Sequence, residues 1–499
     1  MSTIKKQSLR GTLFSYAGVV IGFLSQGILI PNLLTKDQNG LLGIILSFVF
    51  IFAQVASLGF NSSGSRFFPS FSSQKVNGGF LFTGLMISIF GFIIGSFIYY
   101  FLKPMLLETS TGKSFLLEEY YYLVLPVVLG TILFNLFDNY AKNLFETVTG
   151  TFLNQFLQRF IIFAGLLIVL LFHISFHEFV WIWTSAFVIP TILMIITAYR
   201  LGNFSLKPDF AVFTPDFRNQ FLSYSGITVL TGFSSMIIMY IDKIMLNHYS
   251  GLEETGIYNT ASFFGSIMGM SLISMNKAAV PVIVHAFKNE DYTTISTIYK
   301  KSCMVQLIIG GLVYGGIIIN LDAFFELIPQ GYEAGKIVIM IICLGKLFDL
   351  ATGLNGTILN LSKYYKYDSI MIASLIILTV IANMIFIPWK GLIGAAIAAI
   401  FSTFYFNSMR TLIVWKKLKI QPFDFNTIKV IVIATGIVLC AYYLIPHISG
   451  SILYTIIDMA IRSAIFSLIY VGVMYKLKVS TEMNDIINHL FGYIKSLLK

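Results

Sequence analysis

Apolar residues are grouped in long runs that recur along the whole chain. Each run holds about 20 residues with almost no charge, which as a helix is long enough to cross a hydrocarbon layer of roughly 30 Å. The runs do not alternate between apolar and polar residues, as the strands of a membrane β-barrel do. The pattern therefore predicts an all-α membrane protein with about 14 transmembrane helices.

The boundaries of the runs place the spans at residues 11–31, 41–60, 79–102, 120–141, 152–172, 179–199, 221–247, 257–284, 302–320, 336–361, 369–389, 391–415, 428–446 and 452–475. The first span follows Lys5, Lys6 and Arg10 and lacks the small-residue pattern of a signal-peptide cleavage site, so we expect it to remain in the protein. The loops are short, and no soluble domain is expected.

Composition and charge add an orientation to these spans. Of the residues, 57% are hydrophobic and 11% charged, against about 25% charged in soluble domains. Most of the 33 basic residues fall on one side of the predicted spans, and the loops on the other side hold few. Because basic loops stay in the cytoplasm, we expect both termini there. The net charge of +10 is then an orientation signal and needs no nucleic-acid partner.

Two stretches about 210 residues apart share a pattern. Residues 40–69 and 256–281 each open on Gly, run as an apolar helix, pass a small polar patch and close on Pro. Similar entries, Ser-Tyr-Ala-Gly at 15–18 and Ser-Tyr-Ser-Gly at 223–226, precede them. Transporters are often built from such repeats. We predict two six-helix bundles around a central cavity, residues 1–215 and 216–420, followed by two further helices and a cytoplasmic tail at 421–499.

These residues carry a resemblance to a known family. The segment SLGFNSSGSRFFP at 57–69 resembles the end of the second helix in the Wzx-type O-antigen and capsular polysaccharide flippases. These flippases form the polysaccharide-transporter branch of the multidrug, oligosaccharidyl-lipid and polysaccharide flippase superfamily. The segment IDKIMLNHYSGLEETGIYNTASFF at 241–264 resembles that family's entry to the eighth helix. The order, spacing and number of the spans also fit the 14-helix members.

The resemblance implies a function. Two bundles would rock about a central cavity and move an undecaprenyl-diphosphate-linked oligosaccharide from the cytoplasmic to the outer leaflet of the bacterial cytoplasmic (inner) membrane. A proton or sodium gradient would drive the cycle, without another cofactor. Membrane lipid, a polysaccharide polymerase and the chain-length machinery would be the partners.

Ionisable residues inside the spans are candidates for function because their burial in lipid is costly. Lys346 and Asp349 share one face of a predicted helix, since they are three residues apart. Lys346 is a candidate for binding the diphosphate or sugar, and Asp349 for the coupling cation, with a static ion pair as the alternative. Asp242 and Lys243 point about 100° apart, so they are candidates for ion coupling and for substrate binding, respectively. The alternative is that both anchor the helix end.

Further charges lie nearer the predicted cytoplasmic ends. Lys277 and Arg66 are candidates for binding the diphosphate, with simple interfacial anchoring as the alternative. We interpret two other sets as structural ion pairs. They are Asp138 with Arg159, and Asp458 with Arg462, where the latter pair alternatively lines a groove for the lipid tail.

Three other functions remain open at this point. A drug/cation antiporter of the multidrug and toxic compound extrusion family is the main alternative, although such a protein calls for an acidic cavity and acids and bases are balanced inside these spans. A membrane polymerase or glycosyltransferase would need a sizeable aqueous loop and a catalytic motif, and neither catalytic residues nor a metal site are predicted. A membrane scaffold would leave the buried charges unexplained.

Overall fold

The computed structural model divides the chain into two compact units, residues 1–260 and 261–499. The residues that it describes are 2–72, 79–109, 112–202, 204–209, 212–445, 447, 450–481, 483–485 and 488. The predicted boundaries at 215/216 and 420/421 divide the chain by its repeat rather than by compactness, and they stay a prediction.

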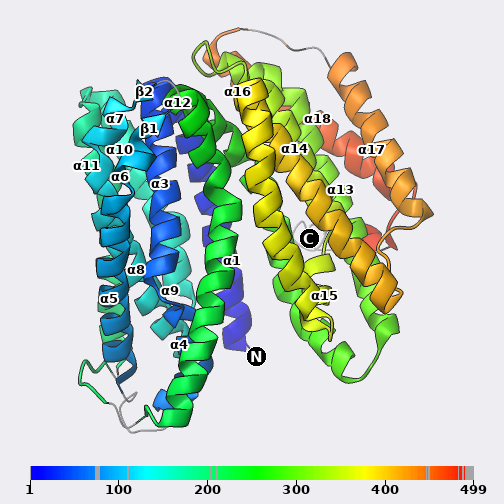
Figure 1. Ribbon diagram of the computed structural model, residues 1–499. Coiled ribbons are helices and arrows are strands. Elements are labelled where there is room, and N and C mark those ends of the chain that lie inside the picture. The colour runs from blue at the N-terminus through cyan, green and yellow to red at the C-terminus, as the bar shows by residue number, and fades with distance from the viewer. Residues whose placement is uncertain are drawn as a thin grey trace. The chain divides into compact units, whose positions relative to one another are not determined.

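The first unit is a bundle of long helices in which α3, α5 and α8 run side by side (Figure 1). Its helices before residue 110 are α1 (Ser2–Gly22), the π-helical η1 (Phe23–Leu29), α2 (Ile30–Leu33), α3 (Lys36–Ala56), α4 (Phe60–Ser72), α5 (Phe80–Phe101) and α6 (Lys103–Leu107). A strand pair follows, β1 (Glu108–Thr109) and β2 (Gly112–Lys113), and these strands are antiparallel. The remaining helices are α7 (Phe115–Glu119), the 3-10 helix η3 (Tyr121–Leu123), α8 (Val124–Asn143), α9 (Val148–Thr151), the π-helical η4 (Phe152–Leu157), α10 (Gln158–Phe172), α11 (Phe176–Arg200) and the first part of α12 (Pro215–Lys288).

Short polar sequences fix where two of these helices begin. Thr35 accepts a hydrogen bond from the backbone N–H of Gln38, and the Gln38 side chain accepts one from the backbone N–H of Thr35. Ser175 and Glu178 form the same reciprocal capping box at the start of α11. Each box pairs two N–H groups that a helix start leaves without a partner. Both helices therefore begin a few residues before the predicted apolar spans.

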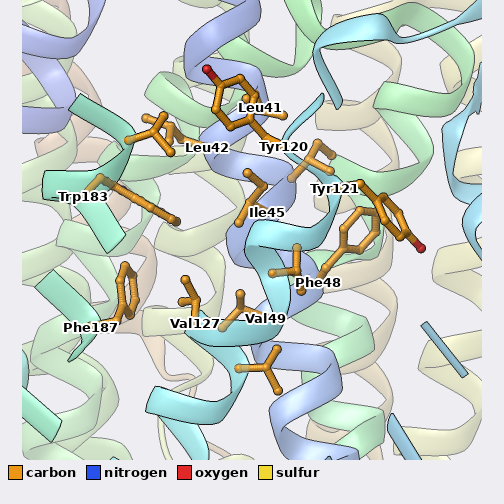
Figure 2. Packing of buried hydrophobic residues seen from close by; sticks show 14 of the residues in the cluster. Leu41, Leu42, Ile45, Phe48, Val49, Tyr120, Tyr121, Val127, Trp183 and Phe187 are labelled. Atoms are coloured by element: carbon orange, nitrogen blue, oxygen red, sulfur yellow. The ribbon is translucent and has the colours of Figure 1, made fainter. Parts of the chain in front are cut away.

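The core of the first unit lies where α3, α8 and α11 meet. Figure 2 shows Ile45 and Val49 of α3 beside Val127 of α8, with Trp183 and Phe187 of α11 on the same cluster. Seven glycine and serine positions in α3 and α5 are also buried, so these helices pack closely. Gly91 of α5 lies so near Ala56 that a Cβ atom there would be 2.0 Å from its carbonyl oxygen. Such small-residue contacts are how helices approach each other in lipid.

Within its described residues, the second unit contains the later part of α12 and six named helices, among which α14 packs on both α13 and α16 (Figure 1). These helices are α13 (Tyr292–Glu326), α14 (Gly335–Thr352), α15 (Asn355–Leu361), α16 (Tyr365–Leu418), α17 (Phe425–Leu444) and α18 (Ile452–Lys476). Both α17 and α18 pack on α13. Gly311 and Gly315 of α13 make room for them, because Cβ atoms there would lie 2.5 Å from the Tyr470 hydroxyl and 2.4 Å from the Phe466 ring.

The helices confirm the predicted fold class. Among the described residues, eleven helices are long and apolar enough to cross a membrane, or twelve if the bent pair α14–α15 is one span. Two of the eleven are much longer than a bilayer is thick, and each contains a glycine with non-helical torsion angles: Gly251 in α12 and Gly391 in α16. Gly251 lies in a predicted loop between spans, and Gly391 is the first residue of the predicted span 391–415. The number fourteen stays a prediction.

The outward surface of the bundles is strongly apolar. Large side chains on single helices are mostly exposed, among them Phe97 and Phe101 of α5, Phe172 of α10 and Leu468 of α18. In water, contiguous apolar surface of this kind would be a strong driving force for aggregation. Lipid covers it at no cost, so these faces are the expected boundary with the hydrocarbon layer.

Candidate functional site

Asp242 and Lys243 each bind a residue beyond the break at Gly251, within the same long helix α12. The Tyr258 hydroxyl donates to Asp242 Oδ2 at 2.5 Å, and Lys243 Nζ donates to Asn259 Oδ1 at 2.7 Å. Adjacent residues on one side of the turn thus bind adjacent residues on the other. The two side chains diverge, as expected for neighbours on a helix, but both are held by polar partners.

The contacts of Lys243 continue into α3. Asn259 Nδ2 donates to Asn39 Oδ1 at 3.0 Å, and Asn39 Nδ2 donates to the carbonyl of Gly256 and to Thr260 Oγ1, both at 2.9 Å. Asn39 is fully buried. A buried amide that uses its donors and its acceptor in this way specifies one arrangement of the two helices. The sequence analysis missed Asn39 and Asn259 because it considered only ionisable groups.

Two glycines let the backbones of α3 and α12 touch beside this network. A Cβ atom on Gly40 would lie 2.1 Å from the carbonyl oxygen of Leu252, and one on Gly256 would lie 2.0 Å from that of Lys36. The contact is reciprocal, since each glycine meets the residue four positions before the other. Gly40 and Gly256 open the two repeated stretches of the sequence, so the repeat appears here as a local two-fold contact. An ion pair between Lys36 and Glu253, at 2.8 Å, lies next to it.

The remaining predicted residues of the first unit lie apart from this network. Arg66 is exposed on α4, with its guanidinium 4.3 Å from the centre of the Tyr224 ring. Asp138 pairs with Lys142 at 2.5 Å, one turn further along α8. Arg159 donates to the backbone carbonyl of Gly18 at 2.9 Å, where α1 and η4 are in contact. The predicted Asp138–Arg159 pair is therefore not formed: the Lys142 ammonium binds the carboxylate, and a backbone carbonyl accepts from the guanidinium.

In the second unit, Lys346 and Asp349 lie on one face of α14, as their spacing predicts. Their charged atoms are 3.8 Å apart, and the Lys346 side chain is 41% exposed. Asp349 Oδ1 also accepts a hydrogen bond of 3.0 Å from Asn407 of α16. Asp349 is thus held from a second helix, whereas the exposed ammonium of Lys346 has a long, screened ion pair that contributes little energy.

The helix that carries this pair is broken one turn later. Gly353 has φ 52° and ψ −110°, and α14 and α15 meet at an angle of 47°. Asn355, just after the break, donates to Asn407 Oδ1 at 3.1 Å. Broken helices inside the bilayer are typical of binding sites in transporters, because their backbone groups must be paired by side chains or ligands. The two glycines of TGLNG at 352–356 are the signal that could have indicated this break.

An ion pair that was not among the predicted site residues lies beside the break between α14 and α15. Arg410 donates from Nε to Asp368 Oδ1 at 2.7 Å, and the exposed fractions of the two side chains are 17% and 3%. The guanidinium also lies 3.9 Å from the centre of the Phe406 ring. Gly356 of α15 packs against Arg410, where a Cβ atom would be 2.6 Å from Nη1. Arg410 falls inside a predicted span. Because it lies near a basic helix end, its charge fits an interfacial anchor, and the sequence does not mark it as a buried ion pair.

Two more predicted groups belong to the second unit. Lys277 is exposed on α12, next to Asn276, whose side chain accepts a hydrogen bond of 2.6 Å from Thr357 of α15. Asp458 and Arg462 form an ion pair at 3.7 Å on α18, as the four-residue spacing predicts, and both are buried.

The arrangement separates charges that are bound from charges that are accessible. Asp242, Lys243, Asp368 and Arg410 are held by side chains across the glycine breaks of their own helices, α12 and α16. Lys277 and Lys346 present ammonium groups that lie on the surface of their unit, and Arg66 presents a guanidinium. Accessible cations of this kind can bind phosphate oxygens through charge-assisted hydrogen bonds. Among the described residues, no group of three or more His, Cys, Asp or Glu side chains is arranged to hold a metal ion.

Comparisons with known sequences agree with this architecture. The model of the polysaccharide biosynthesis protein family matches residues 8–287. The chain is 23% identical to an uncharacterized membrane protein of Methanocaldococcus jannaschii, over 97% of this chain and 99% of that protein. It is 25% identical to the capsular polysaccharide biosynthesis protein CapF of Staphylococcus aureus, over 38% of this chain and 49% of that protein.

Solved structures share the fold. The lipid II flippase MurJ in an inward closed conformation superposes with a TM-score of 0.72 and 15% identity, over 95% of this chain and 99% of that chain. An inward-facing multidrug resistance transporter of the MATE family superposes with a TM-score of 0.65 and 14% identity, over 80% of this chain and 94% of that chain. The chain is thus a multi-pass membrane protein with the fold that these transporters share.

Proposed function

Because the chain belongs to the polysaccharide biosynthesis protein family, we propose that it is a flippase for an undecaprenyl-diphosphate-linked oligosaccharide. It would move this lipid from the cytoplasmic to the outer leaflet of a bacterial cytoplasmic membrane by alternating access. The family match over more than half of the chain is the observation that carries the proposal.

The accessible cations support an anionic headgroup as the ligand. Lys277 and Lys346 belong to the second unit and Arg66 to the first, and each lies on a helix predicted to reach the cytoplasmic leaflet. A diphosphate has enough negative charge to bind more than one cation. Each hydrogen bond between a charged donor and a charged acceptor contributes about 1.5–3 kcal/mol. In this proposal each of these three residues is a separate candidate for contacting the diphosphate, and so is Lys243, whose ammonium also donates to Asn259.

An apolar groove supports a long lipid tail. The groove lies between α17 and α18, has a volume of about 390 Å³, and is lined by Ile437, Leu444, Phe466 and Ile469 among others. We assign it to the polyprenyl chain. Asp458 and Arg462 would then fix the helix that forms one wall of the groove.

Asp349 and Asp242 remain the candidates for coupling to a proton or sodium gradient. Asp349 lies beside a helix break and Asp242 beside a turn, and in both cases the carboxylate accepts a hydrogen bond from a neighbouring segment. Protonation or sodium binding would compete with that bond, so either ion could change how the segments are held. A polysaccharide polymerase and the chain-length machinery would use the lipid after its transfer.

The test is transfer of a fluorescent undecaprenyl-diphosphate oligosaccharide across proteoliposomes that contain the purified protein. We expect Lys346→Glu and Lys277→Glu each to slow transfer at least about tenfold, the effect of losing one charged hydrogen bond of about 1.4 kcal/mol or more. Lys300→Glu, an exposed lysine on α13, is the matched control and should leave the rate unchanged. Wild-type rates in both lysine variants, with the protein correctly inserted, would refute the assignment of the site.

The same proteoliposomes distinguish the antiporter alternative. MATE transporters share the fold, so the fold alone does not choose between the two cargoes. Uptake of a cationic dye that depends on Asp242 or Asp349, together with no transfer of the lipid-linked oligosaccharide, would favour the drug/cation antiporter and overturn the flippase.

A further inference from the structure

Four ionisable side chains from three segments meet at one end of the second unit. His447 lies between α17 and α18, and its two ring nitrogens contact carboxylates on different helices. Nε2 is 2.8 Å from Glu326 Oε1, at the end of α13, and Nδ1 is 2.8 Å from Asp458 Oδ2, in the second turn of α18. Arg462 lies one turn further along α18, 3.7 Å from the same Asp458 oxygen. The charge distribution of the sequence predicts that this end faces outward.

Both ring nitrogens of His447 face carboxyl groups, which is the arrangement of a protonated imidazole. A neutral histidine has one N–H donor, so one of its nitrogens would present a lone pair to a carboxylate. A protonated histidine donates from both nitrogens and satisfies both carboxylates. The charge balance gives the same answer, because Glu326 and Asp458 face one permanent cation, Arg462, and a protonated His447 supplies the second.

Burial strengthens these contacts. The side chains of His447 and Asp458 are 18% and 8% exposed, and Arg462 is more buried still. Arg462 Nε and Nη1 have no hydrogen-bond partner within the described part of the chain, so its interaction with Asp458 is mainly electrostatic. In such surroundings a bridging cation is screened less than at an open surface.

The charged groups around His447 set the direction of its pKa. Burial alone would lower that pKa, but the hydrogen bonds to Asp458 and Glu326 and the negative charges of both carboxylates raise it above the usual 6.5. Near this end of α13, Asp322 is paired with Lys336, the second residue of α14. Because the pKa is raised in the folded protein, the protonated histidine stabilises it fully at pH below about 6.5, and this contribution is lost as the pH rises through the higher value.

The His447 bridge connects α13 and α18, which the hydrophobic effect alone does not hold together in a bilayer. In a bilayer, apolar helices gain little from contact with each other compared with contact with lipid, so interhelical hydrogen bonds and close packing hold them. Besides its small-residue contacts, α18 is joined to α13 by the bond from Tyr470 to the Ile308 carbonyl, at 3.0 Å, and by Asn320 to Ser463, at 2.9 Å. At the opposite end of α18, the His447 bridge lies beside a long hydrogen bond of 3.5 Å that Thr455 donates to Glu326 Oε2.

We propose that His447, Glu326 and Asp458 form a proton-binding site, and that the bound proton fastens α17 and α18 to α13. The site takes a proton from the side that it faces, so the attachment of the last two helices would follow the pH on that side. This proposal does not depend on which cargo the protein carries, because it concerns the protonation and attachment of the helices alone.

The direct test is a titration of the purified full-length protein in lipid nanodiscs, followed by NMR of its labelled histidine side chains. The signal of His447 is identified by its loss in His447→Gln. We expect an apparent pKa above 6.5 in the wild type and a fall toward 6.5 in Glu326→Gln, which removes one carboxylate charge and keeps Asp458. A wild-type value at or below 6.5, or a value that Glu326→Gln leaves unchanged, would overturn the proposal.

A second measurement tests what the proton does. Hydrogen exchange in α18 should be slow at pH 6 and faster at pH 9 than the ordinary pH dependence of exchange explains, and His447→Gln should be fast at both. His173→Gln is the matched control, because His173 also ends a helix and its ring forms no ion pair with a carboxylate of the described residues. A pH effect on α18 that persists in His447→Gln, or that disappears in His173→Gln, would contradict the site.

Discussion

The ionisable side chains inside the helices differ mainly in whether another helix binds them. Asp368 and Arg410 form a short pair with little exposure, and Gly356 leaves room for the guanidinium. Lys346, by contrast, keeps an exposed ammonium at 3.8 Å from Asp349. The cost of burial alone marks both sets as candidates for function. The partners of each side chain distinguish the two cases. Asp368 and Arg410 form a structural pair, whereas the ammonium of Lys346 is accessible to a ligand.

The Asp368–Arg410 pair makes a prediction at this scale. Removal of one partner leaves the other charge buried without compensation, which costs about 3–5 kcal/mol. We therefore expect Arg410→Gln and Asp368→Asn each to lower the midpoint of unfolding strongly when the protein in mixed micelles is titrated with SDS. The matched control is Lys36→Gln in the more exposed Lys36–Glu253 pair, for which we expect about 1 kcal/mol or less. Equal midpoints for Arg410→Gln and Lys36→Gln would contradict the structural role.

At the scale of elements, three glycines interrupt the long helices. Gly251 and Gly391 adopt positive φ angles of 84° and 51°, which only glycine adopts easily. Gly251 falls in a predicted loop, and Gly391 is the first residue of a predicted span. Gly353 has φ 52° inside a predicted span, so apolar periodicity alone missed the break there. A run of apolar residues indicates that a segment lies in lipid. It does not indicate whether the segment is one straight helix.

The contact between α3 and α12 gives the second prediction. A Cβ atom on Gly40 or on Gly256 would lie about 2 Å from a backbone oxygen, and backbone cannot move aside as a flexible side chain does. We expect Gly40→Ala and Gly256→Ala to separate the helices and to destabilise the protein by similar amounts, about 1–3 kcal/mol each, because the contact is reciprocal. The measurement is the yield of a disulfide between cysteines at positions 36 and 253, with the native cysteines replaced.

Gly269→Ala provides the control for this experiment. Gly269 lies in the same helix, with a Cβ position that meets no atom within 4 Å, so alanine should leave the disulfide yield unchanged or raise stability slightly. A yield that Gly40→Ala and Gly256→Ala do not reduce, or that they reduce very unequally, would mean that the two helices do not meet through these residues.

At the scale of the whole molecule, the sequence predicts what depends on composition and periodicity. Apolar bulk, helical spans and the repeat follow from it, and the reciprocal contact of Gly40 and Gly256 fits the repeat. The sequence does not predict which partners the charged residues bind. Asp138 has Lys142 within one turn, and Arg159 reaches a carbonyl of α1, so the predicted pair between them does not form. Such choices depend on how helices rotate against each other. A single sequence does not record that rotation.

The orientation of the whole chain and the count of fourteen spans are tested together by labelling single cysteines with a membrane-impermeant maleimide. Basic loops remain in the cytoplasm, so we expect cysteines at Glu333 and Lys390 to react in intact spheroplasts, and cysteines at Asn289 and Lys366 to react only after lysis. All four positions are exposed, in loops or beside helix breaks, so accessibility in the protein itself does not differ among them. Lys390 is decisive for the count because it precedes Gly391. If α16 crossed the membrane once, position 390 would be buried in lipid and would stay unlabelled in both preparations, whereas two spans joined at Gly391 require it to react from outside.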